Sequence, residues 1–241
     1  MSAIRQVSLW DVDDVETFSP VRDMTVGPVE QIDVREFCRR WHYTNTGGNM
    51  TWNYGLYDGD VLVGVVSYNL PTREACGSVF GEQHLERVAH MGRLVCADEA
   101  PRNSESRLIA GSLTHLSDDK GFWGVLTYAA QDEGHIGYVY QATNAIYTGT
   151  GGDSSYWVDQ DGKRRGTKQG TAANARRMAK SQGWIKHPSL PKHRYVYILG
   201  TPAERRARRK LLKLPSLPYP KSPGVSAPGL PHPTPSSETG V

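Results

Sequence analysis

The stretch Arg93-Leu-Val-Cys-Ala-Asp-Glu-Ala-Pro-Arg-Asn-Ser-Glu-Ser106 decides the fold, because it predicts a strand that runs through a polar loop into a helix. Its apolar run Leu94–Ala97 is typical of a buried strand. Proline and small polar residues at 101–104 then end the strand and cap a helix. We expect that helix over Ser106–Ser117, since apolar residues recur there at helical spacing, at Leu108, Ile109, Leu113 and Leu116.

The loop at the start of this helix is suited to bind an anion. The N–H groups of a first helical turn are unpaired, and the helix dipole is positive there. A capped surface loop without a ligand is the alternative. The residues expected to hold an anionic donor or cofactor are Arg102, Asn103, Ser104, Ser106 and Arg107.

The elements on either side predict a mixed α/β sheet. Trp52–Tyr57 and Val61–Tyr68 read as a hairpin around Asp58-Gly59, a dipeptide that readily adopts a tight turn. Residues 70–84 are expected to form a loop. The remaining expected helices are Val29–Tyr43, Gly137–Ile146, Thr171–Ser181 and Pro202–Leu214, and the remaining strands are Leu85–Ala97, Phe122–Ala130, Tyr156–Val158 and His193–Leu199. Asp33 is placed for the N-cap of the first of these helices.

The expected organisation is one large domain with appendages. An irregular lead-in over 1–28 precedes an acyltransferase-like domain over 29–200, and a basic helix over 201–214 follows. Residues 215–241 are rich in proline and serine with little to bury, so we expect an extended or disordered tail. A strand, anion loop and helix near mid-chain resemble the GCN5-related N-acetyltransferase fold, in which this loop holds the pyrophosphate of coenzyme A.

Charge is divided sharply along the chain. Residues 1–160 carry 11 Lys and Arg against 22 Asp and Glu, whereas residues 161–221 carry 17 against two. Concentrated basic side chains neutralise phosphates and release counterions, so the basic third favours a nucleic-acid partner over a merely solubilising surface. The residues expected to contact DNA are Lys163, Arg164, Arg165, Arg176, Arg177, Arg205, Arg206, Arg208, Arg209 and Lys210.

The cysteine pattern and hydropathy indicate a cytoplasmic protein without membrane contact. Cys38, Cys76 and Cys96 are too few and too far apart for a disulfide framework or a metal knuckle. No segment reaches the roughly 20 apolar residues of a membrane span, and no secretion signal is evident.

Four blocks of the sequence resemble the phage Mom family, whose members modify adenine in DNA. In chain order they are Arg40–Tyr43, the opening block Arg93–Arg107, Gly134–Asn144 with Tyr147–Gly149, and Lys192–Val196. The resemblance implies transfer of a carbamoylmethyl group to N6 of adenine in double-stranded DNA, which protects phage DNA from host restriction. The cofactors to consider are a coenzyme A-type acyl donor and iron. A homodimer is the oligomeric state to consider.

The resemblance also implies functional residues. By motif position these are His42, Tyr43, Arg93, Ser106 and Tyr140, with His42 and Tyr43 as the candidate metal ligands. A further family position, an aspartate ten residues before Tyr140, is Ala130 in this chain. Either Asp132, two residues on, substitutes for it, or the protein works without that carboxylate.

These residue types suit the implied chemistry. A histidine near neutral pH serves as a base or metal ligand, and a phenol as a proton donor; we expect Tyr140 to act as a general acid. For each of them, a packed aromatic side chain without a catalytic role is the alternative. An arginine opening an apolar strand needs an anionic partner, so Arg93 is expected to pair with an anionic ligand or with Asp132, Glu133 or Glu105.

Two other classes of function remain open at this point. One is an acetyl-CoA-dependent N-acetyltransferase that acts on a small amine or a peptide, which predicts tight binding of coenzyme A and incidental binding of DNA. The other is a non-catalytic DNA-binding protein, which predicts that substitutions at Tyr140 and Arg93 leave function intact.

Overall fold

The structure, a computed structural model, describes residues 17–42, 48–151, 154–165 and 172–221. A seven-stranded sheet has the strand order β1-β2-β3-β4-β5-β10-β6, and only β4 and β5 among neighbouring strands run parallel. The expected mixed α/β fold is confirmed. The strands are β1 (Thr25–Pro28), β2 (Trp52–Asp58), β3 (Val61–Asn69), β4 (Val88–Cys96), β5 (Gly124–Ala129), β6 (Ile146–Thr150) and β10 (His193–Ile198).

Helices cover both faces of this sheet. Val65 and Val66 are adjacent on β3 and therefore point to opposite faces. Val65 packs in a cluster with α1 (Gln31–Trp41), and Leu126 of β5 packs with α2 (Arg73–Phe80), so we name this side the α1 face. Val66 packs in a cluster with α3 (Ser104–Asp118), against which α4 (Tyr138–Ala142) also lies, and this side is the α3 face.

The parallel pair at the centre of the sheet separates along its length. Val88–His90 of β4 pairs with Gly124–Leu126 of β5, and no further pairing between the two strands is present among the described residues. β4 nevertheless continues to Cys96 and β5 to Ala129. The sheet therefore opens beyond His90 and Leu126, a place where a ligand could reach the backbone and side chains of both strands.

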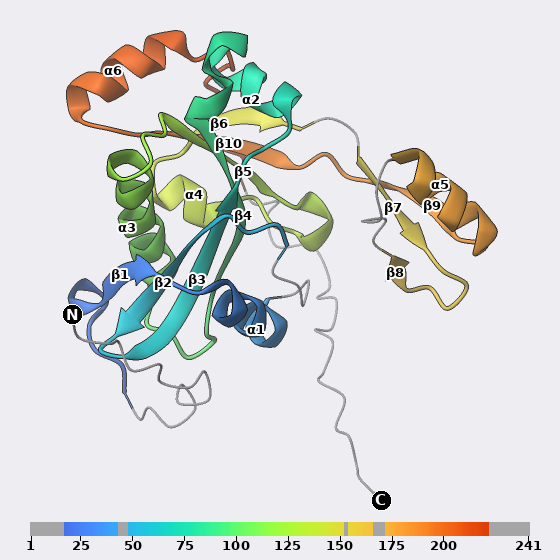
Figure 1. Cartoon of the computed structure of the whole chain (residues 1–241), viewed down its shortest axis with the longest axis horizontal. Helices are drawn as coiled ribbons and strands as arrows, with labels where there is room; N and C mark the ends of the chain where they lie inside the picture. Colours follow the sequence, from blue (N-terminus) through green and yellow to red (C-terminus); the bar gives the residue numbers. More distant parts are fainter. Residues whose placement is uncertain (1–16, 43–47, 152–153, 166–171, 222–241) are drawn as a thin grey trace, which may run out of the picture.

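A second, smaller sheet projects from the body. It has the order β8-β7-β9, from β7 (Ser154–Val158), β8 (Arg164–Arg165) and β9 (Ile185–Ser189), and carries helix α5 (Ala172–Ser181). Figure 1 shows these elements standing away from the seven-stranded sheet, with α6 (Pro202–Leu211) at the other end of the molecule. We call residues 154–189 the arm.

Most elements expected from the sequence are present, with small shifts at their ends. The Asp58-Gly59 hairpin forms, with Gly59 at φ +57°, and α1, α5, β7 and β10 lie where their patterns indicated. Helix α3 begins at Ser104, two residues before the expected start, because Asn103 adopts a left-handed conformation and caps it. Helix α6 ends at Leu211 rather than Leu214.

Five expectations are wrong. Thr25–Pro28 of the presumed lead-in forms β1, because it pairs antiparallel with β2, with Thr25 opposite Tyr57 and Pro28 opposite Tyr54. Residues 70–84 contain α2, capped by the Thr72 hydroxyl, rather than only a loop. The helix expected over Gly137–Ile146 ends at Ala142, and Ile146 instead opens β6. Asp33 was expected near the helix cap, but Glu30 occupies that position.

The fifth concerns residues 215–221, which were expected to be extended or disordered with little to bury but pack against β6. Leu217 N–H donates to the Tyr147 carbonyl at 2.9 Å, and the Tyr219 hydroxyl donates to the Ala145 carbonyl at 2.8 Å. Residues 215–221 therefore lie beside the edge strand β6 and cover an edge that would otherwise be exposed. Residues 222–241 lie outside the described part. None of the helices in the described ranges is long and apolar enough to cross a membrane.

Candidate functional site

Arg93 lies at the centre of the candidate site. It is half-buried on β4, opposite Ser67 of β3, and its Nη1 donates to the Gly92 carbonyl at 2.7 Å. Gly48 lies directly against the guanidinium: a Cβ built on it would come within 3.2 Å of Arg93 Cζ and Nη2. Gly48 also has φ +70°, a conformation that side chains rarely adopt. The loop after α1 therefore needs glycine here to hold the arginine.

His42 ends α1 on the same side of the sheet. Its N–H donates to the Cys38 carbonyl, and only 9% of the residue is exposed. Burial lowers the pKa of His42 to about 4, and the nearby charge of Arg93 and then that of His135 add to the effect. The imidazole is therefore neutral at pH 7. Tyr43, its predicted neighbour in the site, lies outside the described residues.

A second neutral imidazole, His90, was missed by the sequence analysis. It lies on β4 opposite Asn69 of β3, and its Nδ1 is 3.2 Å from Asn69 Oδ1. Burial lowers its pKa to about 4, with smaller contributions from Lys192 and Arg93. No local sequence motif identifies His90 as a site residue, because its neighbours in space come from separate strands and loops. Its position three residues before Arg93 was the one sequence feature that could have suggested it.

Two buried hydroxyls lie where β4 and β5 separate. Ser67 Oγ and Thr127 Oγ1 have no hydrogen-bond partner among the described residues, although both residues are fully buried. Ser67 faces Arg93 across β3 and β4, and Thr127 follows the last paired residue of β5. Buried hydroxyls normally find a partner, so unused ones mark the place where a ligand would supply it.

Tyr140 approaches from the opposite face. It lies on α4, packs with the cluster on the α3 face, and its ring centroid is 5.5 Å from that of Tyr195. Tyr195 is in turn the cross-strand partner of Thr127. The structure thus brings His42 and Arg93 together on the α1 face and places Tyr140 on the other side, next to the strand that bears Thr127.

The predicted anion loop is present at the start of α3, but two of its side chains hold the loop itself. Ser104 is buried, and its hydroxyl donates to the Pro101 carbonyl at 2.7 Å. The Arg107 guanidinium donates to the Met24 carbonyl through Nε and Nη2. The remaining side chains, those of exposed Arg102 and Asn103 and half-buried Ser106, stay as predicted anion ligands.

Asp132 lies at the root of the arm. Its carboxylate accepts from Leu190 N–H at 2.9 Å and from the Ser189 hydroxyl. The carboxylate is exposed and joins strand β9 to the body, which is a structural use of the residue considered as a substitute for the family aspartate. Among the described residues, no group of three or more His, Cys, Asp or Glu side chains is placed to share a metal ion.

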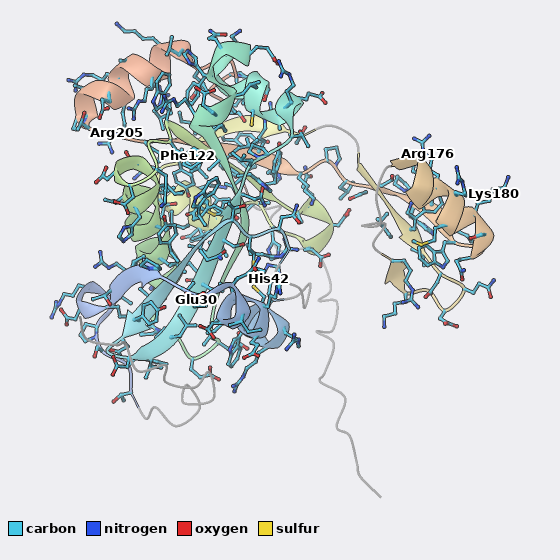
Figure 2. The ribbon with its side chains drawn as sticks, in the orientation of Figure 1. Glu30, His42, Phe122, Arg176, Lys180 and Arg205 are labelled. Carbon is cyan, nitrogen blue, oxygen red and sulfur yellow. The ribbon has the colours of Figure 1, made fainter. Side chains whose placement is uncertain are left out.

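The predicted DNA-contacting residues separate into two surfaces. Figure 2 shows Arg176 and Lys180 on the arm and Arg205 on α6 at opposite ends of the view, with His42 between them. On α6, Arg208 serves the fold: it donates to the Leu199 carbonyl and to Glu204 and lies 5.4 Å from the Trp123 ring. Exposed Arg205, Arg206 and Arg209 line an open hollow of about 300 Å³ together with Asn144, Ile146 and Ile198.

On the arm, Lys163, Arg176 and Arg177 are exposed, whereas Arg165 is paired with Asp159 at 2.5 Å. Lys210 is exposed on α6. Arg164 belongs to β8, and its side chain lies outside the description. The basic third of the sequence is therefore not one continuous surface.

The sequence pattern of the Mom protein family matches residues 23–221. The methylcarbamoylase mom of Escherichia phage Mu is 29% identical over 195 residues, which cover 78% of this chain and 79% of that protein.

Solved structures with a similar arrangement of elements include acetyltransferases. The spermidine/spermine N-acetyltransferase of Vibrio cholerae has a TM-score of 0.45 and 9% identity, covering 79% of this chain and 98% of that one. The ribosomal-protein-S18-alanine N-acetyltransferase of Escherichia coli has a TM-score of 0.43 and 9% identity, covering 74% and 95%.

Proposed function

The chain belongs to the Mom protein family, and on this premise we propose that it is a transferase that attaches a carbamoylmethyl group to N6 of adenine in DNA. The observation that carries the proposal is the family match across residues 23–221, which includes every described residue of the candidate site. A phage or prophage protein acting in the host cytoplasm would by this reaction protect its DNA from restriction.

The reaction needs a base beside the adenine. A bond forms between N6 and the methylene carbon of the transferred group, the bond from that carbon to the donor breaks, and one N6 proton is lost. The N6 lone pair is delocalised into the purine ring, so removal of the proton assists the attack. His42 and His90 are both neutral at pH 7 and lie near Arg93, so either imidazole can accept this proton.

Arg93 would stabilise the charge that develops on the donor. Arg93 is half-buried, and its guanidinium lies close to Gly48, where an added Cβ would come within 3.2 Å of it. A fixed positive charge in a partly desolvated site acts more strongly than the same charge in water, because no solvent has to reorganise as the reaction proceeds.

The donor would be held at the start of α3. Arg102, Asn103 and Ser106 are the side chains that remain available there, and the helix terminus favours negative charge. A coenzyme A-type molecule is the candidate, since its pyrophosphate suits such a site and its thiol would carry the transferred group. Tyr140 would supply the proton to the departing group. No step of the reaction is assigned to a metal.

The test is the state of adenine in DNA that shares a cell with the protein. A plasmid is purified from cells expressing the protein, digested to nucleosides and examined by mass spectrometry. We expect deoxyadenosine heavier by one carbamoylmethyl group, and its loss in Arg93→Ala. Arg73→Ala, which removes an exposed arginine of α2, is the matched control and should modify DNA normally.

The other classes of function predict different results. An N-acetyltransferase acting on small amines would leave plasmid DNA unmodified while consuming acetyl-CoA with an amine substrate. A non-catalytic DNA-binding protein would retain the plasmid on a column without changing its nucleosides. Unmodified deoxyadenosine in cells that contain abundant, folded wild-type protein would overturn the proposed function.

A further inference from the structure

The arm is a separate basic unit of the molecule. Residues 154–189 contain eight Lys and Arg and two Asp, a net charge of 8 − 2 = +6, whereas the whole chain has +3. Its three strands pair only with one another among the described residues, and Figure 1 shows the unit standing away from the main sheet. Ala179 of α5 is fully buried.

One of the two acidic side chains is already used within the arm. Asp159 accepts from Lys163 N–H at 2.8 Å and from Asp161 N–H at 3.0 Å, which closes the turn after β7, and it pairs with Arg165. The α5 side chains Arg176, Arg177 and Lys180 are exposed. Figure 2 shows Arg176 and Lys180 on the part of the arm that faces away from the main sheet. The outward charge of the arm is therefore strongly positive.

The root of the arm joins the candidate site. Gly151 N–H donates to the Lys192 carbonyl at 2.7 Å. This hydrogen bond joins the segment that leads into the arm to the segment that leads out of it. Gly151 lies against Tyr128, since an added Cβ would be 3.2 Å from the ring, and the Tyr128 ring is 5.8 Å from that of His90. The charge of Lys192 also reaches His90. The arm thus begins one side chain away from a histidine of the site.

Helix α6 has no such connection among the described contacts. Its arginines line a hollow with β6 and β10, Arg208 is committed to the fold, and Figure 2 places Arg205 at the other end of the view from the arm. Two similar basic helices therefore differ in one respect that matters for a substrate, namely their position relative to the site.

We propose that the arm is the element that grips duplex DNA, with Arg176, Arg177 and Lys180 of α5 on the phosphate backbone next to the adenine that is modified. The proposal rests on the proposed function for its choice of partner. Contacts to phosphate carry no sequence information, so the arm sets affinity and placement of the duplex rather than the choice of bases. A cationic unit rooted at the site can hold the flanking backbone while the target base leaves the stack.

Two matched variants test this division. One carries R176Q, R177Q and K180Q on α5, and the other R205Q, R206Q and R209Q on α6; each removes three exposed positive charges from a helix. Binding of a fluorescent duplex of about 20 base pairs, two helical turns, is measured without donor over a range of salt concentrations. Circular dichroism and thermal melting confirm that both variants are folded.

The arm variant should bind at least tenfold more weakly than wild type, and the slope of log K against log salt should fall by up to about 3, since each phosphate contact contributes about 0.9. The α6 variant should stay within twofold of wild type. In the modification assay, the arm variant should regain the wild-type maximal rate at saturating DNA, because only binding is impaired. An equal loss in both variants, or a greater loss in the α6 variant, would overturn the proposal.

The binding assay needs no catalysis, so it separates this proposal from the proposed function. If DNA binding depends on the arm but the DNA stays unmodified, the proposed reaction is contradicted and the role of the arm in binding DNA is kept. Modified DNA with binding that does not depend on the arm would keep the reaction and remove the role of the arm.

Discussion

Asn69 Oδ1 lies 3.2 Å from His90 Nδ1, and Asn69 Nδ2 donates to the Asn49 carbonyl at 3.0 Å. Because the amide nitrogen is used by the carbonyl, the oxygen is the atom that faces the histidine. His90 Nδ1 must then carry the proton, which leaves Nε2 with the free lone pair. The pair therefore sets the tautomer of an imidazole beside Arg93.

The first prediction follows from this pair. Asn69→Asp places a negative charge on Nδ1 and should raise the pKa of His90 from about 4 by roughly 1 to 3. If His90 accepts the N6 proton, the acidic limb of the rate profile moves to higher pH by the same amount. Asn69→Leu, which adds no charge, should not move it upward. Rates of DNA modification between pH 4 and 8 locate the acidic limb, which in the wild type should lie near the His90 pKa of about 4. If the acidic limb does not move in Asn69→Asp, His42 rather than His90 accepts the N6 proton.

A second prediction concerns stability in acid. The pKa values of His42 and His90 lie near 4 in the folded protein, below the ordinary histidine value of about 6.5. The unfolded chain therefore binds more protons between these values, and the free energy of unfolding should fall as the pH drops from about 6.5 toward 4. The loss is up to about 3 kcal/mol for each histidine.

Urea denaturation at a series of pH values measures this loss. His42→Gln and His90→Gln should each flatten the dependence, since neither carries a titrating group there. A slope that stays the same in both variants would show that other groups cause the acid sensitivity.

A third prediction concerns Gly48. Gly48→Ala places a methyl group 3.2 Å from the Arg93 guanidinium and strains a residue at φ +70°. Gly59→Ala is the matched control, since Gly59 has φ +57° but open space around its Cβ. Both substitutions should cost about 1 kcal/mol of stability from backbone strain. Only Gly48→Ala should also lower the rate of DNA modification, and equal rates in the two variants would contradict the role assigned to Arg93.

A fourth prediction separates two neighbouring arginines of the anion loop. Arg102→Ala should weaken binding of inorganic pyrophosphate or coenzyme A by about tenfold or more without changing the melting temperature, because the side chain is exposed. Arg107→Ala should instead destabilise the protein by about 1.5 to 3 kcal/mol, because the Met24 carbonyl loses its charged donor. Calorimetric titration and thermal melting distinguish the two effects. If Arg107→Ala instead weakens anion binding and Arg102→Ala lowers the melting temperature, Arg107 rather than Arg102 contacts the anion.

A fifth prediction concerns the segment along β6. Tyr219→Ala removes a hydrogen bond to the Ala145 carbonyl and a contact with the Tyr195 ring, so it should cost about 1 to 2 kcal/mol. Tyr138→Ala is the control, since that side chain is 74% exposed and should change stability by less than about 0.5 kcal/mol. Equal melting temperatures for the two variants would contradict packing of residues 215–221 against the sheet.

Local chemistry accounts for what could be predicted from the sequence. The strand, loop and helix over Arg93–Asp118 and the hairpin at Asp58-Gly59 depend on residues close in the chain, through turn chemistry and hydrophobic periodicity. Four sequence blocks likewise carried the family resemblance, which the match over residues 23–221 confirmed. Short segments whose stability comes from distant partners, such as β1 and β6, were not recognised, because Thr25–Pro28 and Ile146–Thr150 become strands only through pairing with β2 and β10.

The sequence by itself determined the mixed α/β class, the loop that leads from β4 into α3, and the family. Only the tertiary structure decided that His42 and His90 both lie within reach of the charge of Arg93, that Arg107 and Arg208 hold the fold, and that the basic third divides into an arm at the site and a helix away from it. The physical reason is range. Turns, caps and periodicity act over a few residues, whereas burial, charge neighbourhoods and access to a ligand depend on residues brought together from distant parts of the chain.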